Sequence, residues 1–173
     1  MDILIVVDMQ ADFVDGALGT KEAVAIVPKV VETIKDFDGP IVVTYDTHGE
    51  NYMRTSEGRH LPVPHCIKGT PGWELNRQVE AALSGKNVTR VEKPTFGSVK
   101  LPEIVKNLAG GEDFSLELVG LCTDICVVSN ALLLKANFPE AEIAVDASCC
   151  AGVTPATHAA ALDTMKMCQI TVK

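Results

Sequence analysis

The chain has 173 residues and a mass of 18.5 kDa, which is enough to bury a substantial core within one domain. Hydrophobic residues make up 47% and charged residues 22%, which excludes a disordered, collagen-like or coiled-coil chain. The net charge of −8 makes nucleic acid and anionic lipid poor partners. No apolar run approaches the about 20 residues of a membrane span, and the N-terminus does not resemble a signal peptide. We therefore expect one cytoplasmic domain over residues 1–173, with no membrane or nucleic-acid partner.

Short β-branched apolar runs alternate with segments of helical periodicity along the chain. Such runs are typical of strands buried on both faces, and the alternation is typical of a parallel sheet covered by helices. Pro28 suits the first position of a helix, Gly110 a helix end and Thr154 an N-cap. We predict a three-layer α/β/α fold with a mostly parallel sheet of about six strands. In chain order, the predicted elements are strand 3–7, helix 28–37, strand 40–45, helix 73–83, strand 87–91, helix 101–108, strand 114–120, helix 124–136, strand 142–145, helix 155–167 and strand 169–172.

Residues 47–72 break this rhythm, because they contain few apolar residues, several Pro and Gly, and three of the four histidines. A long irregular segment inside a compact domain is usually functional. Ligands of open α/β sheets bind beyond the carboxyl ends of the strands. The polar residues at those ends are therefore the first candidates for a site.

Three reactive side chains follow predicted strands. Asp8 ends the first strand, where it either acts as a general acid or base or caps the next turn. Lys93 follows the third strand and is either a surface residue or a cation that stabilises Asp8 and Cys126. Cys126 lies in the first turn of a helix, where the helix N-terminus lowers a thiol pKa and free N–H groups can bind an oxyanion. The alternative is a cysteine packed on the sheet, which fits Cys122 better.

A second group of polar residues has the spacing of metal ligands. Asp46 and His48 end the second strand two residues apart, so their side chains point to the same side. His65 closes the long loop, and Glu57 and His60 lie between them. An Asp/His/His set with one further donor suits zinc, iron or manganese. The alternative is a loop of solvated histidines.

The six cysteines include no Cys-x-x-Cys pair, which argues against a zinc ribbon or a thioredoxin-type motif. Without a secretion signal we expect no disulfide framework, and most of the cysteines should be small buried side chains.

Several motifs together are more specific than any of these residues alone. Asp8 begins an Asp-x-Gln-x-Asp-Phe pattern, Lys93 is followed three residues later by Phe96, and Cys126 lies in Gly-Leu-Cys-Thr-Asp-Ile-Cys-Val. With these motifs in this order, the chain resembles the isochorismatase-like cysteine hydrolases over nearly its whole length. The segments Asp46-Thr-His and Pro-His65-Cys-Ile-Lys-Gly-Thr-Pro-Gly make it most similar to the nicotinamidases (pyrazinamidases) within them.

The resemblance implies an Asp8–Lys93–Cys126 triad. Asp8 would take the proton of Cys126, Lys93 would hold the ion pair, and the thiolate would attack the carboxamide carbon of nicotinamide to form a thioester. The backbone N–H groups of Cys122 and Cys126 would hold the oxyanion. The family commonly has a cis peptide at the position of Leu121–Cys122. The reaction would release nicotinate and ammonia.

The resemblance also implies one divalent metal ion, with zinc favoured over iron or manganese, that holds the pyridine nitrogen. Asp46, His48 and His65 match the family's ligands. The fourth ligand varies between His and a carboxylate in the family. Glu57 matches the carboxylate form and is favoured over His60.

The substrate pocket departs from the family pattern. Nicotinamidases usually have an aromatic residue three positions before the second metal histidine, where this chain has Pro62 with Leu61 beside it. We expect an aliphatic wall at Leu61, with Phe13 and Phe96 on either side of the ring. The family makes a homo-oligomer plausible. Two alternatives stay open: a metal-free isochorismatase-like hydrolase of another small amide or vinyl ether, and a non-catalytic binding protein.

Overall fold

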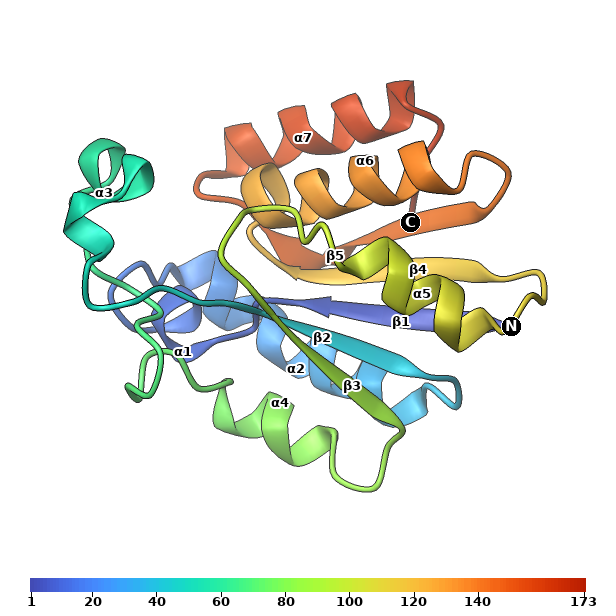
Figure 1. The fold of residues 1–173 in the computed structure, drawn as a ribbon, viewed down its shortest axis with the longest axis horizontal. Coiled ribbons are helices and arrows are strands. Elements are labelled where there is room, and N and C mark those ends of the chain that lie inside the picture. Colours follow the sequence, from blue (N-terminus) through green and yellow to red (C-terminus); the bar gives the residue numbers. More distant parts are fainter.

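The computed structural model describes residues 1–173 and contains one six-stranded sheet with helices on both faces (Figure 1). All neighbouring strands are parallel, and their order is β3-β2-β1-β4-β5-β6. The predicted α/β class is confirmed, and the sheet is entirely rather than mostly parallel. The strands are β1 (Asp2–Val7), β2 (Ile41–Asp46), β3 (Val88–Lys93), β4 (Ser115–Leu121), β5 (Glu142–Ala151) and β6 (Thr171–Val172).

Alternation along the central strand β1 feeds two hydrophobic cores. Leu4 and Val6 pack in a core with α1, α2 and α4, whereas Ile3, Ile5 and Val7 pack on the other face with α5, α6 and α7. Because both faces of the sheet are covered, all of residues 3–7 are buried, as the lack of polar residues in this segment indicates. The helices are α1 (Ala11–Val14), α2 (Lys21–Asp36), α3 (Ser56–His60), α4 (Arg77–Ala82), α5 (Leu101–Ala109), α6 (Val128–Asn137) and α7 (Pro155–Met167).

The predicted start of helix 28–37 is wrong, because α2 begins seven residues earlier, after the N-cap Thr20. Pro28 lies inside the helix instead of at its first position. A proline there removes the bond to the carbonyl four residues back. That carbonyl belongs to Val24, a residue that is 48% exposed.

Other boundaries also differ from the prediction. The helix predicted from residue 73 starts only at Arg77, because the Asn76 side chain accepts from the backbone N–H groups of Gln78 and Val79. The helix predicted over 124–136 is a π-helical turn, η2 (Thr123–Val127), that continues into α6. β5 extends six residues beyond its predicted end at 145, with a register shift opposite β4.

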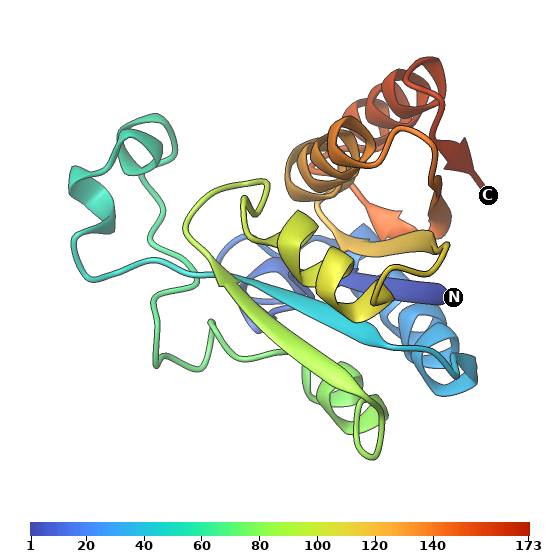
Figure 2. The same ribbon diagram turned by 45° about the vertical axis from the view of Figure 1, so that its right-hand side comes forward.

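The long segment after β2 contains two short helices that the sequence pattern did not predict, η1 (Tyr52–Arg54) and α3. Figure 2 shows α3 standing away from the sheet, beyond the carboxyl ends of the strands. Thr55 caps α3 by accepting from the N–H of Gly58. No helix of the chain combines the length and the apolarity that a membrane span requires.

The close approach of β4 to β1 depends on Gly120. This residue has φ +119°, and a Cβ there would collide with the carbonyl oxygen of Val7. Gly120→Ala should therefore lower the free energy of unfolding by roughly 2–4 kcal/mol, measured by urea denaturation. Gly110→Ala is the matched control, because Gly110 also has a positive φ (+61°) but a Cβ there meets no atom within 4 Å. The control should cost only about 1 kcal/mol, and equal losses would contradict a steric role of the Val7 contact.

Candidate active site

Asp8, Lys93 and Cys126 meet at the carboxyl edge of the sheet, from three different elements. Asp8 follows β1, Lys93 ends β3, and Cys126 lies in η2 after β4. Lys93 Nζ lies 2.6 Å from Asp8 Oδ2 and 3.3 Å from Cys126 Sγ. All three residues are buried. The three residues of the predicted triad are thus in contact through the lysine.

Asp8 is held in place by its backbone and by a neighbouring strand. Its φ is +46°, a left-handed conformation that non-glycine residues rarely adopt. Thr44 Oγ1 donates to Asp8 Oδ1 at 2.7 Å, which leaves Oδ2 for Lys93. Such backbone conformations concentrate at functional sites.

The protonation of the three groups follows from burial and from one another. Burial raises the pKa of Asp8, and the Lys93 ammonium opposes this only in part. Burial lowers the pKa of Lys93, but Asp8, Cys126 and Asp46 outweigh it and raise the pKa above its usual range. Lys93 is therefore charged. A carboxylate whose pKa is raised is a better proton acceptor than an exposed one.

The expectation that the helix N-terminus lowers the pKa of Cys126 is wrong for the resting site. Burial raises the pKa of Cys126 well above that of a free thiol, Asp8 raises it further, and Lys93 opposes both. The resemblance placed Asp8 beside Cys126, but the sequence alone does not show how completely both groups are buried. The raised pKa favours the neutral thiol in the resting site.

The peptide bond between Leu121 and Cys122 is cis, as the resemblance implied. Cys122 and Cys126 both line the pocket, so their N–H groups stay our candidates for the oxyanion site. Of the two thiols, Lys93 contacts that of Cys126 and not that of Cys122.

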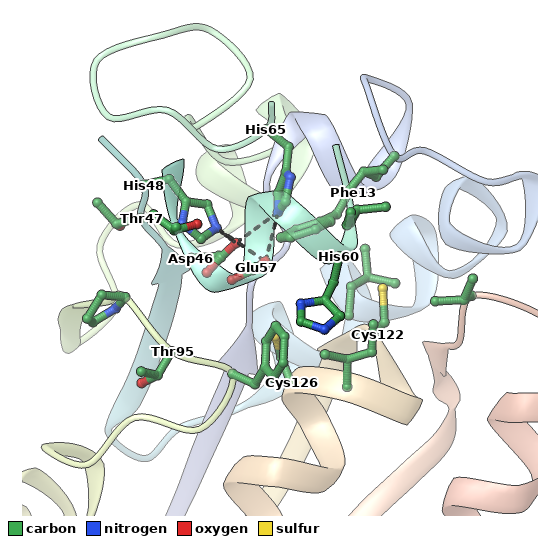
Figure 3. Close-up of a pocket in the computed structure, with 18 of the residues that line it drawn as sticks. Phe13, Asp46, Thr47, His48, Glu57, His60, His65, Thr95, Cys122 and Cys126 are labelled. Carbon is green, nitrogen blue, oxygen red and sulfur yellow. Dashed lines mark hydrogen bonds and ion pairs between the residues drawn. The ribbon is translucent and has the colours of Figure 1, made fainter. Parts of the chain in front are cut away.

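Asp46, His48, Glu57 and His65 form a second cluster, called the metal group below. Four of their ligand atoms lie within 4.8 Å of one another. His48 Nε2 and His65 Nε2 lie 2.9 and 3.4 Å from Asp46 Oδ2, and each lies 3.6 Å from Glu57 Oε1 (Figure 3). The structure brings Glu57 to the other three, whereas His60 lies outside this cluster.

The metal group fits a divalent ion in number, chemistry and spacing. Ligand distances of about 2.1 Å in a tetrahedron place ligand atoms roughly 3.4 Å apart, close to the separations found here. His65 Nδ1 lies 2.8 Å from the carbonyl oxygen of Val63, which can only accept, so Nδ1 carries a hydrogen and Nε2 is the nitrogen that faces the other ligands. Burial lowers the pKa of His65, but Asp46 and Glu57 outweigh it and raise the pKa to about 10. An ion would take the place of that proton.

One pocket of about 940 Å³ is lined by Cys126 of the first cluster and by the whole metal group, whereas Asp8 and Lys93 lie behind its lining. Asp46, His48, Glu57 and His65 line one part of it, and Cys122 and Cys126 another (Figure 3). The three predicted pocket residues line it as well: Phe13 is buried, whereas Leu61 and Phe96 are 37% and 45% exposed.

Comparison with known proteins agrees with this geometry. A family model described as an isochorismatase domain matches residues 2–173. The chain belongs to the isochorismatase family. It is 27% identical to the nicotinamidase/pyrazinamidase of Mycobacterium tuberculosis, over 98% of this chain and 97% of that protein.

Two solved structures have the same fold over the whole length. The nicotinamidase/pyrazinamidase PncA from Bacillus subtilis gives a TM-score of 0.83 at 29% identity, over 99% of this chain and 98% of that chain. The pyrazinamidase of Pyrococcus horikoshii in complex with zinc gives 0.79 at 29% identity, with the same coverage. The family resemblance found in the sequence is confirmed.

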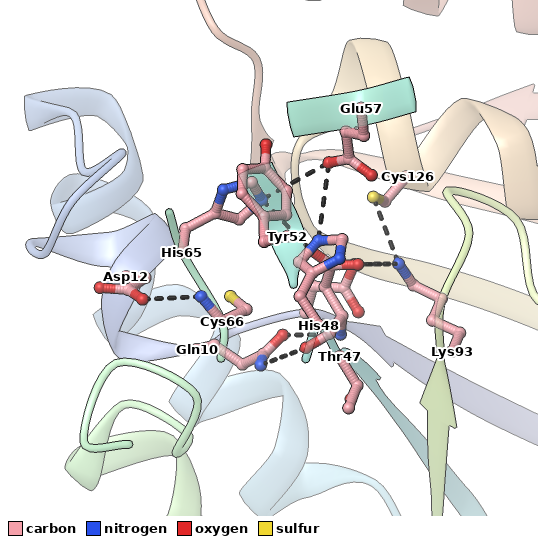
Figure 4. A network of polar contacts seen from close by, with 12 residues as sticks. Gln10, Asp12, Thr47, His48, Tyr52, Glu57, His65, Cys66, Lys93 and Cys126 are labelled. Atoms are coloured by element: carbon pink, nitrogen blue, oxygen red, sulfur yellow. Dashed lines mark hydrogen bonds and ion pairs between the residues drawn. The ribbon is translucent and has the colours of Figure 1, made fainter. Parts of the chain in front are cut away.

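Three further residues of this isochorismatase-family protein support the site, and we did not predict their roles. Tyr52 is buried, its ring packs 4.8 Å from that of His48 and 5.0 Å from that of His65, and its hydroxyl donates to the Leu61 carbonyl. The Gln10 side chain donates to the Asp46 carbonyl and accepts from the Asp46 N–H (Figure 4). Gln10 lies in the Asp-x-Gln motif, and this motif is the one feature of the sequence that indicates a role for it.

Asn130 on α6 is the third. Its side chain is fully buried and binds three backbone groups. It accepts from the N–H of Ser98 at 2.8 Å and donates to the carbonyls of Cys126 at 2.8 Å and Phe96 at 3.3 Å. This clamp fixes the loop that carries Phe96 against the turn that carries Cys126. No sequence pattern pointed to it.

Gln10→Glu should destabilise the protein although it keeps the shape of the side chain. A carboxylate can still accept from the Asp46 N–H, but it cannot donate to the Asp46 and Trp73 carbonyls, which Gln10 Nε2 contacts at 2.9 and 2.8 Å. We expect the free energy of unfolding to fall by roughly 2–4 kcal/mol. Gln78→Glu, on the exposed side of α4, is the matched control and should change it by less than about 0.5 kcal/mol. Equal stability of the two variants in urea would contradict a stabilising role of the Gln10 hydrogen bonds.

Proposed function

We propose that this hydrolase, which acts on carboxamide C–N bonds, converts nicotinamide and pyrazinamide to nicotinate and pyrazinoate, with release of ammonia. The observation that carries the proposal is the shared pocket, which is lined both by Cys126 of the buried Asp8–Lys93–Cys126 cluster and by all four residues of the metal group. The names of the similar proteins point to the same substrates. Nicotinamide would then bind with its ring nitrogen at the metal group and its carboxamide at Cys126.

The first half of the reaction forms a thioester. Asp8 takes the proton of Cys126 as Sγ attacks the carboxamide carbon, and the N–H groups of Cys122 and Cys126 hold the developing oxyanion. Asp8 then gives this proton to the amide nitrogen. The C–N bond breaks and ammonia leaves. Throughout, the Lys93 ammonium stays beside both Asp8 and Sγ and stabilises whichever of them is negative.

The second half hydrolyses the thioester. Asp8 takes a proton from water, and the water oxygen attacks the acyl carbon. The C–S bond then breaks, the carboxylic acid product is released, and the thiolate recovers the proton from Asp8. One carboxylate thus serves as base and acid in both halves, which its raised pKa favours.

Asp46, His48, Glu57 and His65 would hold the ion, and their imidazole and carboxylate donors suit zinc, with iron or manganese as alternatives. When bound, a divalent ion supplies a Lewis acid that binds the pyridine nitrogen and orients the ring. Asp46 connects the two clusters, because its Oδ1 lies 3.7 Å from Lys93 Nζ while its Oδ2 faces the histidines.

Cys126→Ala tests the nucleophile. We expect ammonia release from nicotinamide to fall by at least about 10³-fold, because no thioester can form. Cys168→Ala is the matched control, since Cys168 is an exposed free cysteine outside the pocket, and it should keep wild-type turnover. Comparable activity of the Cys126 variant and the control would exclude the thioester mechanism.

His48→Ala tests the metal group. We expect the affinity for zinc, measured by competition with a chromophoric chelator, to fall by about 100-fold or more, and nicotinamide turnover to fall with it. Glu50→Ala is the control, because Glu50 is an exposed carboxylate of the same loop outside the group. Turnover that survives both chelation and His48→Ala would favour a metal-free hydrolase of the same family.

A further inference from the structure

We propose that His60 forms one wall of the slot for the substrate's aromatic ring, and that it thereby favours planar aromatic carboxamides. This inference rests on the proposed function. It assigns a substrate-contacting role to a residue that is neither in the triad nor in the metal group.

The first observation is the position of His60 in the pocket. His60 ends α3, three residues after Glu57, and residues three apart share one face of a helix. Glu57 joins the metal group, and His60 lines the same pocket. In Figure 3 its ring projects into the space between the metal group and the turn that carries Cys126. A ring held by its nitrogen at one end and by its carboxamide at the other would lie in this space.

The second observation is that the imidazole is already fixed. His60 Nδ1 lies 2.8 Å from the carbonyl oxygen of Ser56, one turn earlier in the same helix. Because a carbonyl only accepts, Nδ1 carries the hydrogen and the ring is held in one orientation. A ring fixed before the substrate binds loses little conformational entropy on binding.

The third observation is that the His60 imidazole can contact a ligand. The side chain is exposed, and the bond to Ser56 is its one hydrogen bond within the protein. Its faces are therefore available to a ligand. Two aromatic rings attract each other beyond the area they bury, which a puckered aliphatic ring cannot reproduce. Phe13, which lines the same pocket and packs 5.4 Å from the His65 ring, offers a second aromatic surface.

The test compares His60→Ala and His60→Phe in nicotinamide hydrolysis by the zinc-loaded enzyme. Stacking acts equally on the bound substrate and the transition state, so its loss raises KM and leaves kcat unchanged. We expect KM to rise about 3- to 10-fold in His60→Ala and to rise less in His60→Phe, which keeps an aromatic face but loses the bond to Ser56. Arg59→Ala, the adjacent exposed residue of α3, is the matched control and should leave KM unchanged.

Zinc affinity separates this role from a structural one. If His60 only positioned α3, its loss would displace Glu57, and His60→Ala would bind zinc more weakly. We expect unchanged zinc affinity in both variants. An unchanged KM in His60→Ala, the same rise in KM in His60→Phe, or a loss of zinc affinity would each overturn the inference while leaving the proposed function intact. A zinc-loaded wild-type enzyme that does not hydrolyse nicotinamide would overturn both.

Discussion

The buried ammonium of Lys93 is the constraint on which the rest of the site depends. A charge removed from water costs several kcal/mol unless it is paired, and Lys93 is only 1% exposed. Its partners come from other elements: Asp8 after β1, Asp46 at the end of β2 and Cys126 after β4. They can surround one nitrogen only if these strands end at the same level. The parallel register achieves this, since Asp46 lies directly opposite Lys93 and Thr44 opposite Val7, the residue before Asp8.

Asp46 makes the two halves of the site interdependent. One carboxylate oxygen faces Lys93, and the other faces both histidines of the metal group. Two sites therefore share one anion, and Asp46 raises the pKa of both Lys93 and His65. The Gln10 side chain, which binds both backbone polar groups of Asp46, fixes the residue at the centre of this arrangement.

The sequence predicted the parts of the structure that follow from local pattern. The apolar run 3–7 could only be a doubly buried strand, and residues directly after strands gathered at one edge, as Asp8 and Lys93 do. Prediction from the sequence failed where long-range contacts determine the structure. Pro28 indicated a helix start because proline suits the first helical position, whereas the structure places it inside α2. Asn130 carries no local signal, since its three backbone partners lie in a loop and a turn that only the fold brings together.

The pKa of Cys126 likewise depends on long-range contacts that the sequence does not show. Its place at a helix N-terminus predicts a lowered pKa, but burial beside Asp8 outweighs that effect and raises it. In the proposed mechanism the thiol is activated by Asp8, a residue more than a hundred positions away. A helix terminus in a sequence indicates where an anion can be stabilised, whereas the resting protonation state depends on desolvation and on the neighbouring charges.

The topology places the residues of the Asp8–Lys93–Cys126 cluster at the strand ends and several other pocket residues in the loop after β2. Asp8, Lys93 and Cys126 leave the sheet within a few residues of its edge, so their positions are tied to the register of the core. Glu57, His60 and Leu61 instead come from α3 and the residue after it, on an excursion that stands away from the sheet (Figure 2). Substitutions in that excursion change the ring end of the pocket without disturbing the strands that hold the reacting groups. A chain of this fold can therefore change the carboxamide it accepts and still break the C–N bond in the same way.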